Sequence, residues 1–144
     1  MVSSVQYLNV SGLLSVVIPA YNEQKTIESV LKKVAAVPIK KEIIVVDDFS
    51  SDGTSDILRR LENNWRTELS PEHVDSLKVL YHEPNIGKGG ALRTGFDQAR
   101  GEIVIIQDAD LEYDPQDYFK LIEPIVSDGA DVVYGSRFVG SEKH

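Results

Sequence analysis

The sequence predicts an α/β domain in which a mostly parallel sheet is flanked by helices. Five short runs rich in valine and isoleucine alternate with stretches whose apolar residues recur at helical spacing. Most of these runs are apolar at consecutive positions, as expected for strands that are buried on both faces. At 144 residues the chain is long enough for one domain with a sizeable core and too short for two ordinary ones.

The predicted strands are separated by turn residues and helical stretches. In chain order they cover 14–19, 42–47, 78–82, 103–107 and 132–136. Segment 1–12 lacks the basic start and apolar stretch of a signal peptide, so we expect a tail or an edge element there. The polar stretch 63–76 is predicted to be a surface loop.

The predicted helices fill the intervals between strands. The residues expected to face the core are Ile27, Val30, Leu31 and Val34 in the first helix, Ile57, Leu58, Leu61 and Trp65 in the second, and Ala91, Leu92, Phe96 and Ala99 in the third, which covers 88–99. A fourth helix is predicted over 115–126, with Pro115 in its first turn and Pro124 kinking or ending it.

Composition narrows the classes of partner. The net charge is -8, and 42% of the residues are hydrophobic and 26% charged, the profile of a globular domain. Nucleic-acid backbones are gripped by clustered lysine and arginine, so we expect no nucleic-acid partner. The absence of cysteine fits a reducing compartment. No apolar run approaches the roughly 20 residues that span a bilayer. We expect a cytoplasmic protein, with peripheral membrane association left open for a longer form.

Two aspartates one residue apart follow the apolar run 103–106. If extended backbone persists, Asp108 and Asp110 project to the same side. Two like charges that close repel each other unless a cation or water screens them. Hard divalent ions take oxygen ligands and often need only one or two carboxylates when substrate phosphates supply the rest. The pair therefore indicates either a metal site or a solvated acidic turn.

Other polar residues also follow predicted strands, and ligands of open parallel sheets bind at that edge. Asp48 is suited to accept hydrogen bonds from a base edge, although Asp47 and Asp48 also precede good helix caps. Tyr21 either stacks on a base or packs, and Glu23 either binds ligand or caps its helix.

Glycines open the predicted third helix and allow backbone amides to approach a phosphate. The segment GKGGAL at 87–92 is not a P-loop, and Leu92 stands where a dinucleotide fingerprint has Gly or Ala. Local spacing thus leaves a nicotinamide-dependent oxidoreductase as an alternative. Lys88 and Arg93 are either phosphate partners or a solvated helix face. The three histidines show no metal-binding spacing and are assigned no role.

Taken together, four ordered blocks closely resemble the inverting glycosyltransferases of family 2. They are VVIPAYNE at 16–23, VVDDFSSDGT at 45–54, NIGKGGAL at 85–92 and QDAD at 107–110. The nearest likeness is to the dolichyl- and polyprenyl-phosphate sugar synthases, a branch in which GSRF at 135–138 also has a counterpart. This resemblance outweighs the oxidoreductase alternative.

The resemblance implies a GT-A (Rossmann-like) fold, a UDP- or GDP-linked sugar donor and a divalent ion, Mg2+ or Mn2+. The nucleotide-binding residues it implies are Pro19, Ala20, Tyr21, Glu23, Asp48, Gly87, Lys88 and Ala109. It implies catalytic roles for Asp108, Asp110 and Arg137, and a metal site formed by Asp108, Asp110 and Glu112. Two residues depart from the family pattern: Phe49 stands where Gly or Asn is common, and Glu112 where many relatives have Gln.

The expected reaction moves a hexose from a nucleotide-diphosphate sugar to an acceptor. A polyprenyl phosphate is favoured because it is already anionic and needs no general base, and none is obvious in the sequence. Members of this branch continue well past the GSRF block. We therefore expect 13–144 to be a nucleotide-sugar-binding domain that is truncated at its C-terminus, largely lacks the acceptor side, and has weak or absent transfer. A noncatalytic nucleotide-sugar-binding fragment remains the alternative, and the oligomeric state is not predicted.

Overall fold

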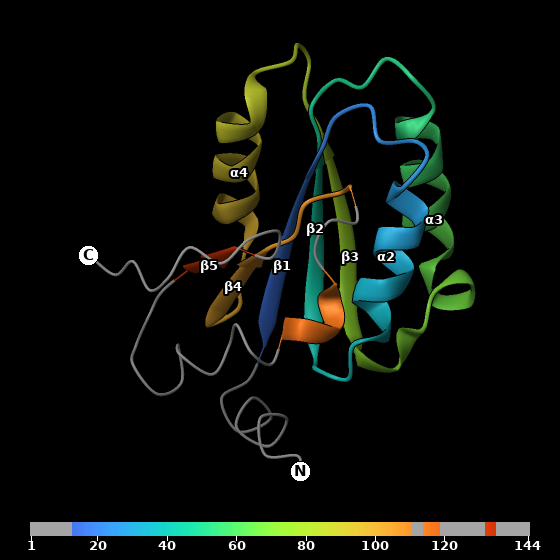
Figure 1. The fold of residues 1–144 in the computed structure, drawn as a ribbon, viewed down its shortest axis with the longest axis vertical. Coiled ribbons are helices and arrows are strands. Elements are labelled where there is room, and N and C mark those ends of the chain that lie inside the picture. Colours follow the sequence, from blue (N-terminus) through green and yellow to red (C-terminus); the bar gives the residue numbers. More distant parts are fainter. Residues whose placement is uncertain (1–12, 111–113, 119–131, 135–144) are drawn as a thin grey trace.

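The described residues form a parallel sheet between helices (Figure 1). The computed structural model describes residues 13–110, 114–118 and 132–134. Its strands are β1 (Leu14–Ala20), β2 (Lys41–Asp47), β3 (Val74–Tyr81), β4 (Ile103–Ile106) and β5 (Val132–Tyr134). They lie in the order β3-β2-β1-β4-β5, and all four neighbouring pairs are parallel. The predicted fold class is therefore confirmed.

Helices cover both faces of the sheet. Helices α2 (Ile27–Ala36) and α3 (Thr54–Glu68) pack against each other and share one core cluster with Ile43 and Val45 of β2. Helix α4 (Gly87–Gln98) contributes to a second cluster with Ile44 and Val46. Alternate residues of β2 thus face opposite helix layers, as the period of a strand requires. Burial on both faces explains why β2 is continuously apolar.

The helix faces follow the predicted spacing in α2 and α3. Ile27, Val30, Leu31 and Val34 are all buried, as are Leu58, Leu61 and Trp65, whereas Ile57 is partly buried. Helix α4 approaches the sheet through small residues instead. A Cβ added at Gly95 would lie 2.4 Å from Cγ1 of Val17, so the helix sits too close to β1 for a larger residue.

This close approach explains why one core prediction for the third helix is wrong. Ala91 and Gly95 are the buried residues of α4, and Phe96 is 38% exposed. Adjacent helix positions are separated by about 100°, so a helix that packs through Gly95 turns Phe96 outward. Leu92 and Ala99 are partly buried.

The predicted surface loop over 63–76 is also wrong. Helix α3 continues to Glu68, and β3 begins at Val74. Trp65 and Leu69, four residues apart, are both buried, and this packing outweighs the polar residues between them. The buried residues of β3 are Val74, Leu77 and Val79, separated by polar or more exposed positions, because β3 is an edge strand of the sheet. Because the exposed positions of β3 include polar residues, the sequence pattern did not indicate where this strand begins.

Several predictions lie wholly or partly outside the described residues. Pro115–Asp117 forms a 3-10 turn, and the remainder of the predicted fourth helix from 119, including Pro124, is outside them. So are segment 1–12, Glu112, Arg137 and the rest of 135–138. Within the described part of the chain, no helix has the length and apolar character needed to cross a membrane.

Candidate functional site

A pocket of about 410 Å³ lies where the carboxyl ends of the strands meet. Its volume falls in the range that holds small molecules in proteins. The lining residues are Pro19, Ala20, Tyr21, Glu23, Asp48, Asn85, Gly87, Lys88, Ala91, Asp108, Ala109 and Asp110. The structure thus brings together all the residues predicted to bind nucleotide, together with both aspartates of the QDAD block.

The loop after β1 is tied to the loop after β2. The amide of Asn22 donates to Oγ of Ser50 at 2.9 Å, and the amide of Ser51 donates to Oδ1 of Asn22 at 2.8 Å. Asn22 takes a left-handed backbone with φ of 55°, a conformation that asparagine tolerates better than most residues. These bonds fix the loop that places Tyr21, which is 49% exposed at the pocket.

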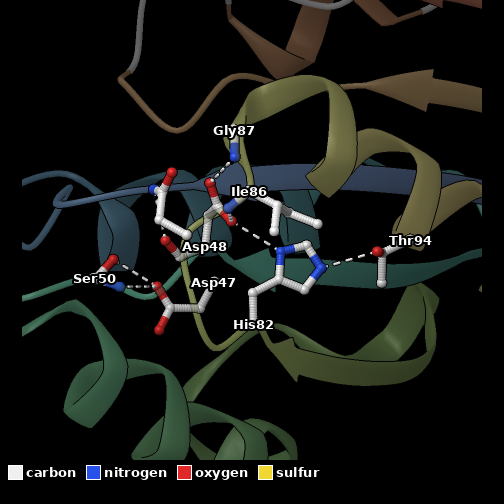
Figure 2. Close-up of polar contacts among 8 residues, drawn as sticks. Asp47, Asp48, Ser50, His82, Ile86, Gly87 and Thr94 are labelled. Carbon is white, nitrogen blue, oxygen red and sulfur yellow. Dashed lines mark hydrogen bonds and ion pairs between the residues drawn. The ribbon is translucent and has the colours of Figure 1, made fainter.

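The carboxylates of Asp47 and Asp48 have separate partners (Figure 2). Asp47 accepts hydrogen bonds from the hydroxyls of Ser50 and Ser55 and so orders its own loop. Asp48 reaches across to α4: Oδ1 accepts from the amide of Ile86 at 2.9 Å and Oδ2 from the amide of Gly87 at 2.8 Å. Asp48 therefore caps a helix whose own N-cap side chain makes no such bond.

Asp48 is ionised because its hydrogen bonds outweigh its burial. Burial alone would raise the pKa of this carboxyl, but the amides of Ile86 and Gly87 and the ring of His82 together lower the pKa below its usual value. Only 5% of the side chain is exposed. A charged acceptor thus lies at the wall of the pocket, held in one orientation by the protein.

His82 is a neighbour of this site that sequence reasoning missed. Its Nδ1 lies 2.9 Å from Oδ1 of Asp48, and its Nε2 lies 2.9 Å from Oγ1 of Thr94 on α4. Asn85 adds a bond from Nδ2 to the carbonyl of Asp48 at 3.0 Å. The available signal was position, since His82 ends the predicted third strand at the same edge as the other site residues.

Asp108 and Asp110 reach the pocket through a turn rather than an extended strand. Strand β4 ends at Ile106, and residues 109–110 form a turn, so the alternation expected from extended backbone does not continue. Gln107 is buried and accepts a hydrogen bond from the hydroxyl of Tyr118 at 2.7 Å. The hydroxyl of Thr26 donates to the carbonyl of Ala109. The turn is thus anchored on two sides.

The carboxylates in this turn stand close to a third acid. Burial raises the pKa of Glu23; the hydrogen bond from Thr26 lowers it, and the charges of Asp110, Asp52 and Asp108 raise it further. Lys88 opposes this negative charge, because its Nζ lies 2.9 Å from Oδ1 of Asp108. The site therefore combines an excess of negative charge with a lysine ammonium group beside it, as expected where a metal cation and a phosphate anion bind together.

The oxygen donors suit a hard divalent ion in part. Asp108 and Asp110 line the same pocket, and two carboxylates suffice when phosphate oxygens complete the coordination. Among residues 13–110, 114–118 and 132–134, no group of three or more potential protein ligands is arranged to hold a metal by itself. A metal there would require ligand oxygens, and Glu112, the third predicted donor, lies outside the described residues.

A family model described as Glycosyl transferase family 2 matches residues 15–143. The chain belongs to this family. It is 33% identical over 132 residues to a dolichol-phosphate mannosyltransferase of Pyrococcus furiosus, an alignment that covers 90% of this chain and 34% of the relative. It is 37% identical over 131 residues to a UDP-N-acetylglucosamine--dolichyl-phosphate N-acetylglucosaminyltransferase of Methanococcus voltae, covering 87% of this chain and 52% of the relative.

Solved structures agree with this family assignment. A mannosyltransferase from Pyrobaculum calidifontis in complex with GDP-Man and Mn2+ superimposes with a TM-score of 0.66 at 30% identity, covering 78% of this chain and 32% of that one. This chain therefore has the GT-A fold, as predicted. It spans only about a third to a half of the length of these relatives.

Proposed function

We propose that this domain binds a nucleotide-diphosphate sugar and takes part in the transfer of the sugar, with inversion, to a polyprenyl phosphate. The observation that carries the proposal is the pocket, where residues from four strand ends meet. Two relatives are dolichyl-phosphate sugar transferases by name. A lipid acceptor would place the protein at a membrane surface.

The lining residues suit the parts of such a donor. Tyr21, half exposed beside Pro19 and Ala20, offers an aromatic face to a base. Asp48 offers a charged acceptor to the polar edge of that base. The start of α4 lies on the same wall, and a helix N-terminus with glycines favours phosphate oxygens. Lys88 adds a positive charge there.

The transfer creates negative charge on the leaving diphosphate. A bound Mg2+ or Mn2+ would stabilise this charge more in the transition state than in the ground state. Asp108 and Asp110 would hold the ion, and the anchoring of their turn by Thr26 and Tyr118 would keep both carboxylates in place. A polyprenyl phosphate already carries the negative charge of a nucleophile, so the chain need not provide a general base for it.

Calorimetric titration of UDP and GDP, with and without Mn2+, tests the proposal. At least one nucleotide should bind more tightly with Mn2+, and Asp110→Asn should weaken that binding by about tenfold or more, which corresponds to about 1.4 kcal/mol. The matched control is Asp97→Asn, an exposed position on α4 that does not line the pocket. If neither UDP nor GDP binds to the folded chain, the proposal is overturned.

A second candidate is a domain that binds the donor without transferring it, because the described residues supply the donor pocket. The chain covers 34% and 52% of the two relatives described above. An assay of sugar release from a bound donor separates the candidates, because an active site hydrolyses donor slowly when no acceptor is present. Binding without any release would favour the second candidate.

A further inference from the structure

The carboxylate of Asp48 has few acceptor positions left for a ligand. A carboxylate offers about four lone-pair positions, two on each oxygen. Oδ1 already accepts from the amide of Ile86 and contacts Nδ1 of His82, both at 2.9 Å. Among the described residues, Oδ2 accepts only from the amide of Gly87. Figure 2 shows the His82 ring and the start of α4 around this carboxylate. A ligand can therefore add a hydrogen bond at Oδ2 and not at Oδ1.

His82 is held in the orientation that occupies Oδ1. Its other ring nitrogen, Nε2, lies 2.9 Å from Oγ1 of Thr94. Because an ionised carboxylate only accepts, Nδ1 must carry a proton, and in the neutral ring Nε2 then accepts from the hydroxyl of Thr94. The ring is only 13% exposed, so it cannot readily leave.

The polar edges of the two candidate bases place different demands on Asp48. Uracil presents one N–H, at N3, between two carbonyl oxygens, and a single acceptor satisfies it. Guanine presents two parallel N–H donors, at N1 and the exocyclic N2, which pair with both oxygens of a carboxylate. Proteins that read a base do so by hydrogen bonds to this edge. A buried donor left without an acceptor weakens binding strongly.

We infer that His82 is a specificity-determining positioning residue and that the donor of this protein is linked to uridine rather than guanosine. The inference rests on the proposed nucleotide-binding function. His82 occupies Oδ1 of Asp48, so the carboxylate offers one acceptor, which fits the single N–H of uracil. The paired donors of guanine leave one N–H unmatched.

The test measures the dissociation constants of UDP and GDP, each with Mn2+, for the unaltered chain and three variants. The unaltered chain should bind UDP about tenfold more tightly than GDP. His82→Leu removes the ring nitrogen from Oδ1. The ratio of the GDP dissociation constant to the UDP dissociation constant should then fall severalfold toward one. His82→Asn, whose side-chain NH2 can replace Nδ1–H, should keep the original ratio. His73→Asn, at the opposite end of β3, is the matched control.

The ratio of the two dissociation constants separates a role of His82 in base specificity from a merely structural role, because partial unfolding would weaken the binding of both nucleotides alike. If His82→Leu does not fold, Thr94→Val serves instead. It removes the hydroxyl that contacts Nε2 of His82, and it should lower the ratio of the GDP to the UDP dissociation constant to a smaller extent. GDP binding as tightly as UDP to the unaltered chain would overturn the inference and leave the proposed function standing. Binding of neither nucleotide would overturn both. If the ratio of the two dissociation constants is unchanged in folded His82→Leu, His82 does not determine the specificity for the base.

Discussion

Glu42 and Glu23 lie at opposite ends of the sheet, and their pKa values are shifted in opposite directions. Glu42, near the amino end of β2, is buried and accepts hydrogen bonds from Ser15 and from the amide and side chain of Arg100. Burial alone would raise its pKa, but these hydrogen bonds and the charge of Arg100 lower it. Glu23, after β1, has its pKa raised by burial and by neighbouring acids, against a smaller lowering by Thr26.

The difference separates stability from function. At the amino end the buried carboxylate has its partners within the protein, so its charge helps to hold β1, β2 and the turn before β4 together. At the carboxyl end Glu23, Asp108 and Asp110 line one pocket, and Lys88 is the one cation among the described residues that line it. Such crowding disfavours the folded state by itself and is relieved when a cation binds. A carboxyl group in a cleft whose pKa is raised, like that of Glu23, is typical of functional sites.

The largest expected effect is at the amino end. Glu42→Leu removes the acceptor of the Ser15 hydroxyl and the Arg100 amide, and buried donors left unsatisfied should reduce the free energy of unfolding by about 3 kcal/mol. Urea denaturation measures this loss. Nucleotide affinity of the folded variant should stay the same, because the network lies away from the pocket.

Asp75→Asn is the control for that variant. Asp75 meets the exposed end of the same arginine at 3.2 Å, and surface pairs of this kind contribute less than about 1 kcal/mol. Equal losses from the two variants would contradict the view that the buried end of the network carries the stability.

A smaller effect is expected at the carboxyl end. Thr26→Val removes the hydroxyl that donates to the carbonyl of Ala109, and one such bond contributes about 1 kcal/mol to stability. Because this carbonyl lies between Asp108 and Asp110, Mn2+-dependent nucleotide binding should weaken severalfold as well. Thermal unfolding and calorimetry measure the two effects.

The matched control is Thr67→Val on the surface of α3. The Thr67 hydroxyl donates to the carbonyl of Asn64 at 3.1 Å, far from the pocket residues. It should leave nucleotide binding unchanged. Loss of binding in both variants would show that the turn is not specifically held by Thr26.

The smallest effect is a change in the pH dependence of stability without added metal. The pKa of Glu42 is lowered from 4.5, so its contribution is present above about pH 4.5 and is lost as the pH falls through the folded value. The pKa of Glu23 is raised from 4.5, so its contribution is present below that pH and is lost as the pH rises through the folded value.

Glu42→Gln should therefore remove part of the rise in stability with pH, and Glu23→Gln part of the opposing fall. Urea denaturation between about pH 3 and pH 7 measures both slopes, since stability follows the difference in bound protons between the two states. Slopes that change in the same direction in both variants would contradict the contrast between the two ends of the sheet.

Much of this fold was predictable because the signals are local. The apolar runs predicted β1, β2 and β4 to within a residue or two, and their carboxyl ends predicted which side chains meet at the pocket. The failures occurred where tertiary packing overrides local pattern. Phe96 lies outward because α4 packs through Gly95, and the polar segment after Asn63 holds the end of a helix and the start of a strand.

The sequence by itself determined the fold class, the family resemblance and the gathering of Asp48, Asp108 and Asp110 at one edge of the sheet, because strand period and chain order dictate them. Only the tertiary structure decided what those side chains bind. Hydrogen bonds between residues 34 to 39 positions apart set the partners of Asp48. A histidine with no recognisable motif thereby came to lie against the carboxylate, since such distant contacts depend on how helices and strands pack.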